Sequence, residues 1–198
     1  LYCDAARAVR RRAARTVMDE IVRRVVTWFA PIMCFTMEEA WLSRFPEAES
    51  VHLETFFAVP SSWANPALIE KWKRVRELRR VVTGALELER AAKKIGSSLE
   101  AAPTLYIADK ADADILRSIP FDEVAITSGI GIVSGDAPGT AFALPDVRGV
   151  AVIANLSPGG KCERCWRVLT EVGTHKNHPH LCDRCDAAVA DQPEKSPA

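Results

Sequence analysis

GGKCERCWRVLTEVGTHKNHPHLCDRC, residues 159–185, contains four of the six cysteines of the chain, arranged as two Cys-x-x-Cys pairs. Sixteen residues separate the pair Cys162 and Cys165 from the pair Cys182 and Cys185. Two tight turns that face each other can surround Zn²⁺ with the tetrahedron of thiolates that this ion prefers. The spacing therefore predicts a zinc ribbon or knuckle with one structural zinc ion. Because the segment has little apolar content, metal binding would supply its folding free energy.

Other uses of these cysteines are less consistent with the sequence. Two disulfides would need an oxidising compartment, and the N-terminus does not resemble a signal peptide. A redox Cys-x-x-Cys normally occurs once, at the start of a helix. Three loop histidines could replace a thiolate, but with four cysteines present we expect them at the surface: His175, His178 and His180. Four thiolates would also saturate the zinc and leave no position for a catalytic water.

The composition is that of an ordinary protein of 198 residues, 48% apolar and 26% charged, with a formal net charge of zero. This length suits one or two domains with a small additional module. The longest apolar run, residues 25–37, is interrupted by Pro31 and is too short to span a bilayer. Cys3 and Cys34 are isolated, which favours a reducing, cytoplasmic location. The chain starts at Leu1 without a methionine and reads as a piece of something longer.

The first hundred residues predict helices. An apolar stripe at helical spacing runs over residues 7–30, and we expect it to be buried: Val9, Ala13, Val17, Ile21, Val25 and Trp28. TMEE, residues 36–39, reads as a capping box that starts a second helix. Asn65 and Pro66 start the longest helix, which extends to Ile95 and stops at Gly96. Gly84 in its middle predicts a close packing contact. Together these elements predict an all-α bundle over residues 1–100.

The hydrophobic period changes after residue 100. Short strands are predicted over residues 104–108, 124–128, 129–134, 141–144 and 150–154, with a helix over 112–118. We therefore expect an α+β junction domain over residues 101–157 and a zinc-binding domain with four cysteine ligands over 158–190. Residues 191–198 are polar and are predicted to form a disordered tail.

The sequence favours binding over catalysis. No glycine loop of the phosphate-binding type precedes a helix, no Gly-x-Ser-x-Gly is present, and no catalytic residue is predicted. Basic residues gather in the helices and around the cysteines, where they suit a folded or single-stranded nucleic acid. The alternative to RNA binding by the helix arginines is that they form a solvated helix face. The alternative to base stacking on Trp166 is that its ring covers the metal site. The RNA-binding candidates are Arg11, Arg12, Arg15, Arg79, Arg80, Lys161, Arg164, Trp166 and Arg167.

Several stretches closely resemble the C-terminal part of bacterial isoleucyl-tRNA synthetases, which are class I enzymes. They are CFTMEEAW (34–41), SVHLETF (50–56), VVTGALELERAAKKIGSSLEA (81–101), KCERCW (161–166) and LCDRC (181–185). RRAARTV (11–17) resembles the anticodon-binding helices of that family. The resemblance covers the chain to about residue 190, and the motif of four cysteines is intact.

The resemblance implies a multi-domain fold: an anticodon-binding helix bundle over residues 1–100, the junction domain over 101–157 and the zinc-binding domain over 158–190. It implies the four cysteines as zinc ligands but does not single out particular arginines for RNA. The partners would be the anticodon stem-loop of isoleucine tRNA and the upstream catalytic and editing domains, in a monomer. ATP would bind only in that catalytic domain, so this chain alone should be inactive.

Two other classes of protein remain as alternatives. The spacing of the cysteines also resembles the zinc finger of formamidopyrimidine-type DNA glycosylases, but those enzymes start with a catalytic proline that this chain lacks. A zinc-stabilised protein-interaction module is the other alternative, and it would show no salt-dependent affinity for RNA.

Overall fold

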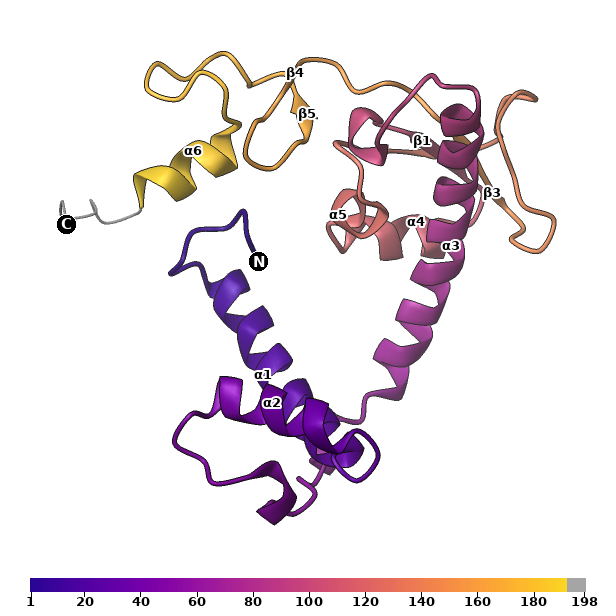
Figure 1. Cartoon of the computed structure of the whole chain (residues 1–198). Coiled ribbons are helices and arrows are strands. Elements are labelled where there is room, and N and C mark those ends of the chain that lie inside the picture. The colour runs from indigo at the N-terminus through magenta and orange to yellow at the C-terminus, as the bar shows by residue number, and fades with distance from the viewer. Residues whose placement is uncertain (192–198) are drawn as a thin grey trace. The chain divides into compact units, whose positions relative to one another are not determined.

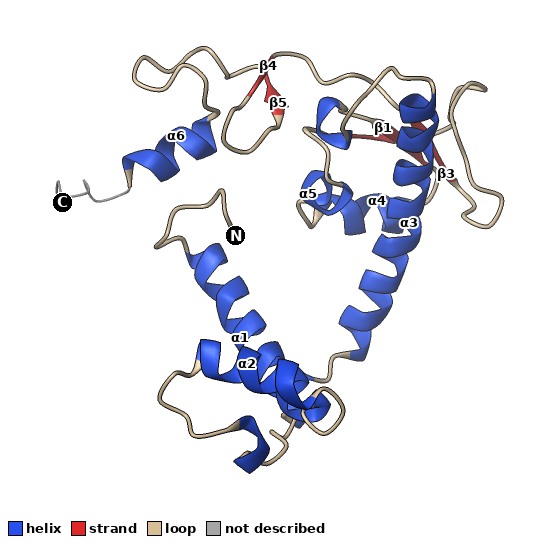
Figure 2. Cartoon of the chain, viewed as in Figure 1, coloured by secondary structure: helices blue, strands red, loops and turns tan. Residues whose placement is uncertain are grey.

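The computed structural model describes residues 1–191 and divides into two compact units (Figures 1 and 2). One unit contains residues 1–64 together with residues 188–191, and the other contains residues 65–187. The expected tail lies outside the described residues, apart from Asp191. None of the helices in residues 1–191 combines the length and the apolar character that a membrane crossing requires.

The first unit is built on two helices, α1 (Val9–Phe29) and α2 (Cys34–Arg44), followed by short 3₁₀ turns at Val51–Leu53 and Ser61–Trp63. Its small core consists of Val26, Ala30, Trp41 and Val51. These buried positions come from both helices and the first 3₁₀ turn, so the core holds the three elements together.

The predicted buried face of α1 is wrong. Val17 and Ile21 are 57% and 54% exposed, whereas Arg24 is buried. Burial of this arginine is tolerated because its guanidinium donates to the Glu20 carboxylate at 2.7 Å and to the Ala58 carbonyl at 2.8 Å. The packing partners of α1 therefore select the face that carries Arg24 and Val26, which the apolar periodicity did not indicate.

The predicted capping box at the start of α2 is also wrong. The helix begins at Cys34, and its N-cap residue Met33 makes no side-chain cap bond. Glu38 instead accepts hydrogen bonds from Ser50 Oγ at 3.0 Å and from the Val51 amide at 2.9 Å. This carboxylate therefore fastens the following 3₁₀ turn to α2.

In the second unit, α3 (Pro66–Ala91) packs against a small mixed sheet. β1 (Thr104–Ile107) is the central strand, parallel to β2 (Gly131–Ser134) and antiparallel to β3 (Val150–Ile153). The helices α4 (Lys110–Arg117) and α5 (Phe121–Ala125) connect β1 to β2. The shared core contains Val75, Leu78, Val82, Leu86, Leu105, Ile107 and Val152.

The start of α3 is confirmed, because the Asn65 side chain accepts a hydrogen bond from the Leu68 amide at 3.0 Å. The helix ends earlier than predicted, at Ala91, and Lys93 takes the left-handed backbone conformation in place of Gly96. The close contact at Gly84 is confirmed, since a Cβ there would lie 2.7 Å from Cε1 of the Phe142 ring.

Two strand predictions are wrong. Residues 124–128 contain the end of α5 and a left-handed turn at Ile126, because Phe121 and Ala125 are buried in the helical conformation. Residues 141–144 contribute only an isolated bridge between Phe142 and Val152. α3 shares its core with the sheet, and the two compact units divide after Ala64. The domain boundaries near residues 100 and 157 stay predictions.

The cysteine-rich segment contains a two-stranded ribbon and a short helix. β4 (Gly160–Lys161) pairs antiparallel with β5 (Val168–Leu169), and α6 (Asp183–Ala190) begins directly after Cys182. Gly159 allows the ribbon to close, because a Cβ there would overlap the Leu169 carbonyl oxygen and its φ is 107°.

Candidate metal centre and nucleic-acid interface

The four predicted zinc ligands come together. The sulfurs of Cys162, Cys165, Cys182 and Cys185 all lie within 4.8 Å of one another, and all four cysteines are free. Cys165 Sγ and Cys182 Sγ are 3.6 Å apart. A tetrahedral site with Zn–S bonds of about 2.3 Å has sulfur–sulfur edges of about 3.8 Å, whereas a disulfide would need about 2.05 Å. The spacing of the sulfurs fits a metal tetrahedron.

Local backbone geometry places each sulfur. In the first Cys-x-x-Cys turn, the Trp166 amide donates to the Cys162 carbonyl at 2.8 Å, and the Cys162 amide donates to the Arg167 carbonyl at 2.8 Å. The second pair lies at the start of α6, where the Asp186 amide donates to the Cys182 carbonyl at 2.8 Å. A turn at the end of a ribbon therefore faces the first turn of a helix.

Hydrogen-bond donors point at the sulfurs, which suits thiolates. The Cys182 amide donates to Cys162 Sγ at 3.4 Å, and the Arg164 guanidinium donates to Cys185 Sγ at 3.5 Å. Burial raises the pKa of the Cys162 thiol, but backbone N–H groups outweigh burial and lower this pKa to about 6. Burial raises the pKa of Cys182 and of Cys185. The donor set fits a divalent, thiolate-binding metal, whose charge would hold all four sulfurs deprotonated.

The loop histidines do not belong to the sulfur cluster among the described residues. The imidazole of His175 lies 2.8 Å from Asp183 Oδ1, and that of His178 lies 2.6 Å from Asp186 Oδ1. Both histidines therefore fasten the loop to α6.

Trp166 has an unusual backbone conformation for its size. Its φ is 66°, in the left-handed region that costs a side chain with a Cβ about 1–2 kcal/mol. The residue is 63% exposed, so most of the ring is open to solvent beside the metal centre. Strained residues that are held in place by their surroundings are common at functional sites.

The other candidates near the cysteines differ in their partners. Arg167 donates to Asp122 Oδ2 at 2.5 Å and to the Ser128 carbonyl at 2.6 Å, so its guanidinium joins the ribbon to the end of α5. Arg164 faces the sulfurs, as described above. Lys161 is exposed on β4, and its side chain makes no hydrogen bond or ion pair within residues 1–191.

The helical candidates fall into two groups. Arg11, Arg12 and Arg15 lie on the first half of α1, where Arg12 and Arg15 have no side-chain partner in the described part of the chain. On α3, Arg79 donates to the Val124 carbonyl at 2.7 Å, and Arg80 pairs with Asp146 at 2.9 Å on the surface. Among these candidates, the guanidinium groups without a partner in the described residues therefore lie on α1.

Sequence reasoning missed Arg44. This residue ends α2 and reaches α1, where its Nε donates to Asp19 Oδ1 at 2.7 Å. It thus adds a further cation beside the α1 arginines. Because Arg44 lies 25 positions after Asp19 in the sequence and the contact depends on how α2 packs, no local pattern could have indicated it.

Comparison with known proteins matches both parts of the chain. A family model described as the anticodon-binding domain of tRNA ligase matches residues 1–105, and one described as the zinc finger found in FPG and IleRS matches residues 159–188.

Curated relatives include isoleucine–tRNA ligases of three bacteria. The chain is 52% identical over 189 residues to that of Brucella abortus (strain 2308), 50% identical over 190 residues to that of Ruegeria pomeroyi, and 48% identical over 189 residues to that of Agrobacterium fabrum. Each match covers 96% of this chain but only 19%, 19% and 20% of the respective relative. The chain thus spans about a fifth of the length of these relatives.

Proposed function

Since the chain belongs to the family of anticodon-binding domains of tRNA ligases, we propose that it is the tRNA-binding C-terminal part of an isoleucine–tRNA ligase. In this proposal it recognises the anticodon stem-loop of isoleucine tRNA. The observation that carries the proposal is the order of its two parts, an anticodon-binding match followed by a buried cluster of four sulfurs that fits a zinc finger.

Chemically different groups would contact the RNA. Arg12 and Arg15 have no partner to release among the described residues, so their guanidinium groups are available to phosphates. Lys161 offers a further cation beside the metal centre, and the exposed ring of Trp166 offers a surface on which an unpaired base can stack. The other predicted RNA contacts have partners within the protein that would hold their side chains in position. They are Arg11, Arg79, Arg80, Arg164 and Arg167.

The zinc ion would be structural. When bound, it cross-links Cys162 and Cys165 to Cys182 and Cys185 and leaves no position for a substrate. The four cysteines thereby fix the ribbon against the first turn of α6. This arrangement holds Trp166 in its strained conformation, so an intact metal centre presents the ring to the RNA.

The contribution to catalysis would act at a distance. Binding energy from the anticodon end would place the acceptor end of the tRNA at the catalytic site in the upstream domains, where ATP activates isoleucine and mistaken valine is edited. This chain would contribute no catalytic residue and would be inactive alone. The intact ligase would be a cytoplasmic monomer.

One zinc-finger model covers both FPG proteins and isoleucyl-tRNA synthetases, so the finger alone would also suit a DNA glycosylase. The anticodon-binding match over residues 1–105 favours RNA.

Titration of the zinc-loaded chain with labelled isoleucine tRNA separates these possibilities. The controls are the same tRNA with an altered anticodon loop and a DNA duplex that bears an oxidised base. We expect preference for the native loop and loss of that preference after chelation. Tighter binding to the damaged duplex would contradict the proposal, and so would equal affinity for the two tRNAs.

A further inference from the structure

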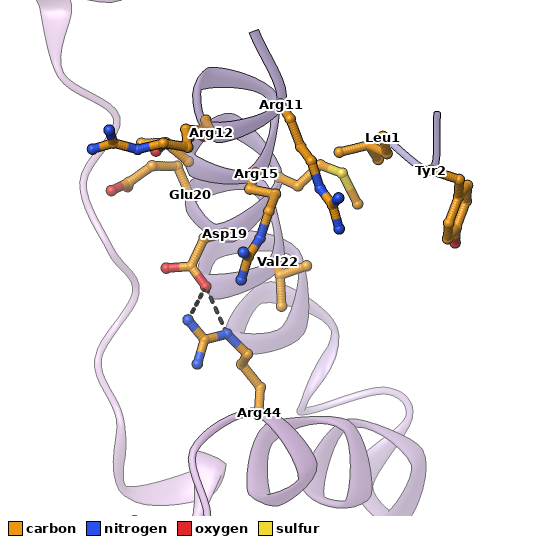
Figure 3. A pocket seen from close by; sticks show the side chains of 11 residues that line it. Leu1, Tyr2, Arg11, Arg12, Arg15, Asp19, Glu20, Val22 and Arg44 are labelled. Atoms are coloured by element: carbon orange, nitrogen blue, oxygen red, sulfur yellow. Dashed lines mark hydrogen bonds and ion pairs between the residues drawn. The ribbon is translucent and has the colours of Figure 1, made fainter. Parts of the chain in front are cut away.

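A pocket of about 700 Å³ lies along the first half of α1, within the first compact unit (Figure 3). Its lining includes four arginines and only two carboxylates. Small-molecule sites usually have volumes of about 300–1,000 Å³, so the pocket has room for one nucleotide but not for a duplex.

Both carboxylates already have cationic partners. Asp19 accepts from Arg23 Nε at 3.1 Å and from Arg44 Nε at 2.7 Å, and Glu20 accepts from Arg24 at 2.7 Å. Burial alone would raise the pKa of Asp19, but the hydrogen bonds from the two arginines outweigh it and lower the pKa. Asp19 therefore stays ionised and holds Arg44 in place, without neutralising the remaining arginines.

The remaining arginines repel one another. Arg11 and Arg15 are four residues apart on the same face of α1, a spacing at which like charges destabilise a helix. Arg11 donates to the Asp4 carbonyl at 3.1 Å, and Arg15 has no partner in the described chain. In Figure 3 the Arg15 guanidinium lies between those of Arg11 and Arg44. An anion in the pocket would relieve this repulsion.

The same face continues with apolar side chains. Met18 and Val22 line the pocket three and seven residues after Arg15, which places them on the same side of α1. A cationic end beside an apolar end matches a phosphate group and the C–H face of the sugar attached to it.

We propose that this pocket is a nucleotide site that takes one phosphodiester group of an unpaired RNA nucleotide on Arg11, Arg15 and Arg44. The ribose lies against Met18 and Val22. The assignment rests on the proposed function, because tRNA supplies the RNA, and it adds a defined site in the first compact unit.

The experiment compares a pocket variant of the zinc-loaded chain with two control variants. Arg11→Gln/Arg15→Gln removes two pocket guanidiniums. Arg7→Gln and Arg7→Gln/Arg148→Gln are the controls, because both residues are exposed, lie outside the pocket lining and have no side-chain partner in residues 1–191. The probe is an anticodon stem-loop RNA of isoleucine tRNA, titrated at several salt concentrations. A second measurement is the protection of arginines from phenylglyoxal by the same RNA, read by mass spectrometry.

We expect the pocket variant to bind the RNA roughly tenfold more weakly. The slope of log K against log salt should also become shallower by about 0.7 or more. The double control should lose clearly less, and the RNA should protect Arg15 but not Arg148. If the pocket variant and the double control lose the same affinity and Arg15 is not protected, the pocket assignment is wrong while the tRNA-binding role stands. If the unaltered chain binds no RNA, both are wrong.

Discussion

At the scale of single residues, Trp166 combines two features that oppose stability. Its backbone has a φ of 66° and its large ring is mostly exposed. A glycine would adopt this conformation at less cost. The residue is therefore better explained by what the ring can bind than by what it contributes to folding.

Replacement of Trp166 should separate stability from binding. We expect Trp166→Gly to raise the free energy of unfolding of the zinc-loaded ribbon by about 1 kcal/mol, because strain is released. The same change should cost about 1–3 kcal/mol of RNA binding, because one stacked base is lost. Denaturant unfolding and fluorescence titration measure the two effects. The Trp166→Phe variant is the matched control and should keep most of the affinity. Unchanged RNA affinity in Trp166→Gly would exclude stacking on this ring.

Gly84 shows a contact that the sequence did indicate. A Cβ at this position would meet the Phe142 ring at 2.7 and 2.8 Å. That ring has limited freedom, since the Phe142 backbone is paired with Val152 in both directions.

We expect Gly84→Ala to destabilise the second unit by about 1 kcal/mol or more, because overpacking exceeds the gain in helix propensity. Denaturant unfolding measures this change. Phe142→Leu should lower the free energy of unfolding less in the Gly84→Ala background than in the unaltered chain. Gly139→Ala should leave this free energy nearly unchanged, because no atom lies within 4 Å of the added Cβ. A Gly84→Ala variant that is more stable than the original would show that the ring moves freely.

At the scale of elements, the ribbon is attached to the end of α5 through charged contacts. Arg167 bonds Asp122 and the Ser128 carbonyl, while the Ser128 hydroxyl accepts from the Val168 amide at 2.7 Å. Arg184 on α6 pairs with Glu123 at 3.3 Å. These contacts orient the metal-binding segment relative to the sheet of its own unit.

Loss of Arg167 should loosen this attachment without removing the metal. We expect Arg167→Gln to cost about 1.5–3 kcal/mol, because a partly buried Asp122 loses a charged hydrogen bond. Hydrogen exchange of residues 121–128 and 159–170 should accelerate, while the zinc content stays at one ion per chain. The control is Lys161→Gln, which alters an exposed side chain on the adjacent β4. Equal exchange in both variants would show that the contact does not hold the ribbon.

Local patterns in the sequence predicted some elements well. Asn65 and Pro66 fixed the start of α3, and the cysteine spacing indicated the sulfur cluster, because both signals act over a few neighbouring residues. The buried face of α1 and the helix α5 were not predictable in this way. The face of α1 depends on partners such as Ala58 for Arg24, and α5 depends on the burial of Phe121. Arg11 and Arg15 on α1 were recognisable as RNA-binding candidates from the sequence, whereas the place of Arg44 beside them depends on how α2 packs.

At the scale of the whole molecule, each compact unit carries one candidate RNA-binding feature. The first has the arginine-lined pocket, and the second has the metal centre with Trp166. Two separate features allow an RNA to be read at more than one point, which suits recognition of a folded stem-loop. In the proposed function, the rest of the ligase would use this recognition to position the other end of the tRNA.

The most direct test of this account uses an intact isoleucine–tRNA ligase that contains this region and carries Cys182→Ser. We predict that kcat/KM for charging isoleucine tRNA falls at least tenfold, because in the proposed function an intact metal centre is needed to present the ribbon to the anticodon loop. Isoleucine-dependent ATP–pyrophosphate exchange, which does not involve the tRNA, should remain unchanged. If charging is unaffected, or if exchange falls by the same factor as charging, the region does not act through tRNA recognition.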